Sequence, residues 1–186
     1  MGSIVEKGGE RDAAQVLANG GIYAGAALGF LVAPAPIWYA IGAGALAASA
    51  ADTWATEVGT LASGDPRSIT SGRRVPPGTS GGITLVGTAA GVAGALFIAA
   101  GATLAHWPAA LAAVALGGVA GALADSVLGA TLQARRWCEL CAQSTERLVH
   151  SCGTASRRAG GLNGLDNDAV NTVCSGVGAL VALLLS

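Results

Sequence analysis

The stretch PAALAAVALGGVAGALADSVLGA, residues 108–130, decides the fold class. Its length matches the roughly 20 residues that a helix needs to cross a bilayer, and its one charged residue, Asp125, comes near the end. The sequence therefore predicts an all-α fold, a polytopic transmembrane helix bundle in one membrane domain over residues 1–186. About five spanning helices are expected, at residues 13–32, 37–57, 83–104, 108–130 and 169–185.

The composition excludes an ordinary soluble domain. Hydrophobic residues make up 52% of the 186 residues and charged residues only 11%, against about 25% charged residues in soluble proteins. The 29 glycines fit a membrane bundle, since small residues let transmembrane helices approach each other closely. We expect the bilayer as a partner and no binding of nucleic acid. Whether the chain forms a homodimer is left open.

The basic residues predict the topology. All 10 Lys and Arg residues fall within residues 1–12, 52–82 and 131–168, whereas the short connections at 33–36 and 105–107 carry none. Cytoplasmic loops of membrane proteins are enriched in Lys and Arg. We therefore expect a multi-pass protein whose basic loops, and any active site beside them, face the cytoplasm.

Acidic and amide side chains gather at the ends of the spans that meet these basic segments. A carboxylate inside a membrane helix costs about 2.5–3.5 kcal/mol on insertion scales, so it usually faces a polar cavity or a partner. Carboxylates from separate spans that converge suit Mg²⁺, which prefers oxygen ligands and often bridges phosphates. The alternative is that acids near helix ends are interfacial caps. The residues concerned are Asn19, Asp52, Glu57, Asp125, Ser126, Asp166, Asn167, Asp168 and Asn171.

A glycine-rich segment, GRRVPPGTSGG at residues 72–82, precedes the third span. Glycines let backbone N–H groups approach an anion closely, and a following helix N-terminus favours negative charge. Two arginines beside such a loop suit phosphate oxygens. The segment lacks the Gly-Lys-Ser/Thr ending of a Walker loop. The candidate phosphate-binding residues are Arg73, Arg74, Gly78, Thr79, Ser80, Gly81 and Gly82.

Soft metal ligands occur in the polar segment 131–168. Cys138 and Cys141 have the Cys-x₂-Cys spacing of structural zinc sites, and His150 and Cys152 follow nine and eleven residues after Cys141. We expect a cytosolic zinc knuckle over residues 138–152, with unconnected thiols as the alternative. Cys174, in the last span, is expected to be a small packing residue.

Five motifs together resemble one protein family. They are KGGERDAAQVLANGG at 7–21, ADTWATEVG at 51–59, PPGTSGG at 76–82, LADSVLGATLQ at 123–133 and LDNDAVN at 165–171. In this order they resemble the DUF92 family, which includes the transmembrane protein 19 type and the phytyl-phosphate kinases of plants and cyanobacteria.

The resemblance implies a membrane kinase. Such an enzyme would phosphorylate an isoprenyl monophosphate, of the phytyl or geranylgeranyl type, to the diphosphate with a nucleoside triphosphate, CTP or ATP. On this hypothesis Asp52, Glu57 and Asp125 bind Mg²⁺ and are catalytic, and the other polar residues named above bind substrates. A small membrane transporter and a noncatalytic membrane assembly protein are the alternatives.

Overall fold

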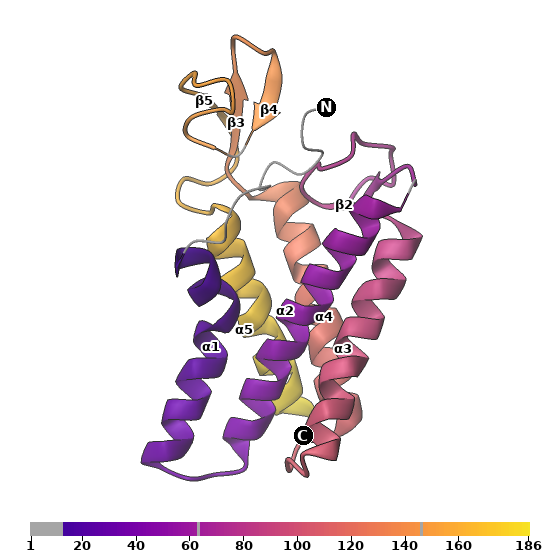
Figure 1. Cartoon of the computed structure of the whole chain (residues 1–186), viewed down its shortest axis with the longest axis vertical. Helices are drawn as coiled ribbons and strands as arrows, with labels where there is room; N and C mark the ends of the chain where they lie inside the picture. The colour runs from indigo at the N-terminus through magenta and orange to yellow at the C-terminus, as the bar shows by residue number, and fades with distance from the viewer. Residues whose placement is uncertain (1–12, 63, 146) are drawn as a thin grey trace.

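The computed structural model describes residues 13–62, 64–145 and 147–186, and these form mainly a bundle of helices (Figure 1). The predicted helical membrane bundle is confirmed. Short turns join the first helix to the second and the third to the fourth at one end of the bundle (Figure 1). Two long segments make the other connections at the opposite end, which we call the polar end. The helices are α1 (Ala13–Val32), α2 (Ile37–Leu61), α3 (Leu85–Leu104), α4 (Leu111–Thr131) and α5 (Asn167–Leu185).

Helix α2 differs from the other four. By length and composition α1, α3, α4 and α5 can each cross a membrane, whereas α2 is less apolar, although it has 25 residues. It lies among the others and contacts all four, and Ala43, Ala45, Ala47, Ala48 and Ala51 are fully buried on it. Because its neighbours cover it, α2 can carry polar side chains without exposing them to lipid.

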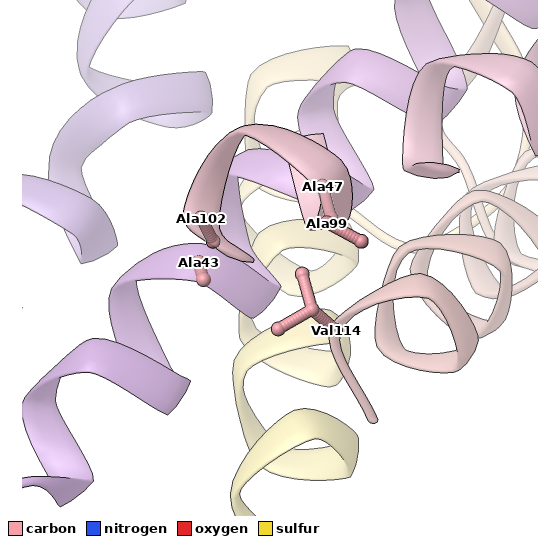
Figure 2. Close-up of a cluster of buried hydrophobic side chains, with 5 residues drawn as sticks. All are labelled: Ala43, Ala47, Ala99, Ala102 and Val114. Carbon is pink, nitrogen blue, oxygen red and sulfur yellow. The ribbon is translucent and has the colours of Figure 1, made fainter. Parts of the chain in front are cut away.

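Small residues hold the bundle together. A Cβ at Gly178 of α5 would lie 2.5 Å from the carbonyl oxygen of Gly44 on α2, so these two backbones are in direct contact. Near the short turns, small side chains of α2, α3 and α4 form a buried apolar cluster of Ala43, Ala47, Ala99, Ala102 and Val114 (Figure 2). This close packing ties the three helices together at the end away from the polar segments.

Two small sheets extend from the polar end, and the all-α prediction missed them. Strands β1 (Arg67–Ser68) and β2 (Gly82–Ile83) pair antiparallel in the segment between α2 and α3. Between α4 and α5, β3 (Arg135–Cys138) lies between β4 (Gln143–Thr145) and β5 (Arg157–Gly160), antiparallel to both.

The described arginines all lie in these two segments, as the basic-residue pattern predicted. Lys7 and Arg11 lie outside the described residues.

Candidate functional site: a cavity at the polar end

A cavity of about 660 Å³ opens at the polar end, and all five helices contribute to its wall. The segment between α2 and α3 covers part of it. Most of the polar residues that the sequence singled out meet here, although they come from five separate parts of the chain. The predicted site residues that line the cavity are Asn19, Asp52, Glu57, Gly78, Thr79, Ser80, Gly81, Gly82, Asp125, Ser126, Asn167 and Asn171.

The carboxylates of Asp52 on α2 and Asp125 on α4 share this cavity. Both side chains are half-buried, whereas Glu57, also in the wall, is exposed. The two carboxylates therefore reach one cavity from two different helices. With the amides of Asn167 and Asn171, they place oxygen donors, the ligand type that hard divalent cations prefer, in the wall of one cavity.

One helical turn before Asp52, hydrogen bonds of Ser49 connect α2 to α1 and α5. The Ser49 hydroxyl of α2 donates to the backbone oxygen of Asn19 on α1 at 2.7 Å, and it lies 2.9 Å from the hydroxyl of the fully buried Ser175 on α5. The amide nitrogen of Asn19 donates to the carbonyl of Gln15 in its own helix. These contacts set the positions of α1 and α5 relative to Asp52.

The glycine loop, residues 78–82, is held against α4. Gly81 has φ +74° and packs so tightly that a Cβ there would lie 2.5 Å from both the carbonyl oxygen of Ser126 and the Cβ of Ala130. The amide of Ile69 donates to the Gly81 carbonyl at 3.0 Å, which couples the loop to the β1–β2 pair. The loop backbone is therefore fixed beside the end of α4 that carries Asp125.

Four predicted site residues do not line the cavity: Arg73, Arg74, Asp166 and Asp168. Arg74 is exposed and pairs with Asp65 at 3.0 Å. Asp166 accepts a hydrogen bond from the amide of Ala169 at 3.0 Å and caps α5, as the alternative interpretation of acids at helix ends expected. Asp166 and Asp168 thus do not complete the polar cavity as expected, and Arg73 and Arg74, expected to hold donor phosphates, lie outside its wall.

The Cys and His residues of the segment between α4 and α5 form a second site. The ligand atoms of Cys138, Cys141, His150 and Cys152 all lie within 4.8 Å of one another. The Cys138 and Cys152 sulfurs are 3.6 Å apart, and Nδ1 of His150 lies 3.2 Å from the Cys152 sulfur. Thiolates about 2.3 Å from a tetrahedral ion are spaced about 3.8 Å apart, so this group can hold a metal ion.

Local structure prepares Cys152 as a ligand. Val149 and Ala155 pair across a hairpin, and the His150 amide donates to the Thr154 carbonyl at 2.9 Å. Hydrogen bonds from the Thr154 side chain and then from His150 lower the pKa of Cys152 to about 5. The thiolate, which is the form that binds metal, is therefore favoured at neutral pH.

Comparison with known proteins identifies the family. The family model described as "Integral membrane protein DUF92" matches residues 1–179. The chain belongs to this family.

Two curated relatives resemble this DUF92 chain. Protein PGR of Arabidopsis thaliana is 34% identical over 135 residues, which cover 66% of this chain and 46% of that protein. An uncharacterized membrane protein of Methanocaldococcus jannaschii is 40% identical over 98 residues, 52% of this chain and 41% of that protein. The chain thus spans less than half the length of these relatives. No solved structure matches it significantly.

Sequence reasoning on this DUF92 chain missed Gln133 as a site residue. It follows α4, lines the cavity and is only 4% exposed. Its amide nitrogen is buried and has no hydrogen-bond partner within the described part of the chain. The available signal was the motif LADSVLGATLQ at 123–133, which begins beside Asp125 and ends on Gln133.

Proposed function

We propose that this chain forms the catalytic site of a membrane kinase, which transfers a phosphoryl group from CTP or ATP to an isoprenyl monophosphate of the phytyl or geranylgeranyl type. One observation carries the proposal: Asp52, Asp125 and the glycine loop line a single cavity at the polar end of an apolar bundle. There the phosphate of a bilayer lipid can meet a water-soluble nucleotide.

The residues in the wall suit phosphoryl transfer. This reaction depends mainly on positioning and on neutralising charge. The acceptor phosphate, whose second pKa is about 6, is already largely ionised at neutral pH, so the site needs no strong general base. Asp52, Glu57 and Asp125 would hold Mg²⁺, which when bound neutralises charge on the phosphates.

The glycine loop and Gln133 would bind the phosphates of the nucleotide. Glycine at positions 78 and 81, with φ of +81° and +74°, allows the backbone to come close to an anion. The buried amide nitrogen of Gln133 needs an acceptor, and a phosphate oxygen would supply one. Arg73 and Arg74, outside the cavity, would add positive potential near its entrance.

We propose that the Cys₃His group binds structural Zn²⁺. Four protein ligands complete a tetrahedral site and leave no open position for catalysis. The metal would hold together the small sheet of β3, β4 and β5, which has 11 strand residues. Of the largest fully buried side chains in the described part of the chain, only that of Cys138 lies in this sheet. By the positive-inside rule, both sites would face the cytoplasm.

The direct test is transfer of label from γ-labelled CTP or ATP to phytyl or geranylgeranyl phosphate by the full chain in lipid nanodiscs. We expect the labelled diphosphate, formed only with Mg²⁺ present. A transporter would give no labelled lipid but would move a solute across a proteoliposome membrane. An assembly protein would bind no nucleotide, and either result would overturn the proposal.

A further inference from the structure

Helices α3 and α4 contact each other partway along their length, and nearer the polar end both line the cavity. They touch where a Cβ at Gly118 would lie 2.7 Å from the Cβ of Ala95. Figure 1 shows that the two helices run antiparallel, so the residues one turn nearer the polar end come earlier in α3 and later in α4. Those residues, Val92 on α3 and Ala122 on α4, both line the cavity. The contact at Gly118 therefore closes the bottom of a slot between the helices.

The walls of this slot are apolar and extend to the outer surface. Val92 and Leu123 line the cavity and are 40% and 46% exposed. Val92 lies on the same helical face as Leu96, and Leu123 on the same face as Leu116. Their helices also expose Leu96 and Leu116, which do not line the cavity. In a membrane bundle such an apolar outer face contacts lipid. The slot thus lies between the hydrocarbon region and the cavity.

We propose that this slot binds the hydrocarbon chain of a single-chain lipid phosphate, which enters sideways from the bilayer between Val92 and Leu123. The inference rests on the proposed function for the position of the phosphate. Six residues separate Asp125 from Val119 in the wall, or about 9 Å along the helix. A lipid whose phosphate lies beside Asp125 would place the first part of its chain against Val119 and Val92.

Crosslinking tests the slot without requiring turnover. Val92 or Leu123 is replaced by the photoreactive p-benzoylphenylalanine, and the full chain in nanodiscs is irradiated with labelled geranylgeranyl monophosphate in the absence of nucleotide. Leu96 and Leu116 are matched control positions, because they lie on the same helices with 46% and 55% exposure but outside the cavity.

We expect labelling at positions 92 and 123, and only background at 96 and 116. An excess of unlabelled geranylgeranyl phosphate should abolish the labelling, whereas geranylgeraniol, inorganic phosphate and the two-chain lipid phosphatidate should not. Equal labelling at all four positions, or equal competition by phosphatidate, would overturn the proposal.

The outcome is separable from that of the kinase assay. Site-specific labelling without phosphoryl transfer would retain the lipid slot and reject the kinase. Transfer without labelling at 92 and 123 would retain the kinase and reject the slot. Val92→Trp and Leu123→Trp add a check in an active protein: both should lose activity on geranylgeranyl phosphate, while Leu96→Trp and Leu116→Trp keep it.

Discussion

Gly81 packs directly on Ser126: a Cβ at Gly81 would lie 2.5 Å from the Ser126 carbonyl oxygen. Ser126 follows Asp125, so the glycine loop and this carboxylate are held together through one backbone contact. A loop that binds phosphate and a carboxylate that binds a cation must keep a fixed separation if both are to act on one nucleotide.

Gly81→Ala should therefore weaken nucleotide binding. The new methyl group cannot fit against α4, and alanine at positive φ adds about 1–3 kcal/mol of backbone strain, so the loop would shift. We expect the dissociation constant for Mg-CTP to rise by about tenfold or more, measured by calorimetry.

Gly72→Ala is the matched control for this change. Gly72 also has positive φ, at +66°, but a Cβ there would meet nothing within 4 Å. A similar loss of Mg-CTP affinity in both variants would show that backbone strain alone, and not the contact of Gly81 with α4, weakens nucleotide binding.

Asp125→Asn should abolish turnover while the protein stays folded. The substitution keeps the shape of the side chain and removes the charge that would hold Mg²⁺. Loss of a group that merely supports a metal ligand lowers metal affinity or activity by up to about a hundredfold. We therefore expect the kinase activity of Asp125→Asn to fall by at least about a hundredfold. Asp65→Asn, at an exposed acid paired with Arg74 outside the cavity, should retain activity. Full activity of Asp125→Asn would remove this residue from the mechanism.

The arrangement of the cavity was largely predictable from the sequence. Long basic segments alternate with short uncharged turns, so the second and fourth spans must end on the same side. Asp52 and Asp125 come near those ends. That they also share one cavity follows from the small residues of α2, which let the other helices approach it from every side.

Other features depend on tertiary contacts that no local pattern encodes. The short strands of the segment between α4 and α5 pair residues such as Arg136 and Arg158, which lie far apart in the sequence. Arg74 was predicted from the sequence to bind phosphate, but in the fold it forms an ion pair with Asp65. Gln133 lies beyond the end of α4 and is buried by the segments that pack around it, which a run of polar residues does not reveal.

Gln133→Leu should raise the KM for the nucleotide. If the amide nitrogen donates to an ionised phosphate oxygen, its loss removes one hydrogen bond to a charged group, worth about 1.5–3 kcal/mol, or roughly ten- to a hundredfold in affinity. The KM for the lipid phosphate should not change. Gln143→Leu, at an exposed position on β4, is the control. An unchanged nucleotide KM in Gln133→Leu would contradict this role.

The purified chain should contain one zinc ion, and Cys138→Ser should lose it. Cys138 is the fully buried member of the Cys₃His group, whereas Cys174 is buried in α5 and serves as the control. Elemental analysis by mass spectrometry should find zinc in wild type and Cys174→Ser only. Removal of the metal should also make the segment between α4 and α5 more sensitive to protease. Unchanged sensitivity after complete chelation would show that the metal does not hold this segment.

The most direct measurement is an experimental structure of the protein with Mg²⁺ and a non-hydrolysable CTP analogue. We expect the terminal phosphate between Asp52, Asp125 and the glycine loop, with the metal on the two carboxylates. A nucleotide bound outside this cavity, for example on Arg73 and Arg74, or a metal bound away from both aspartates, would contradict it.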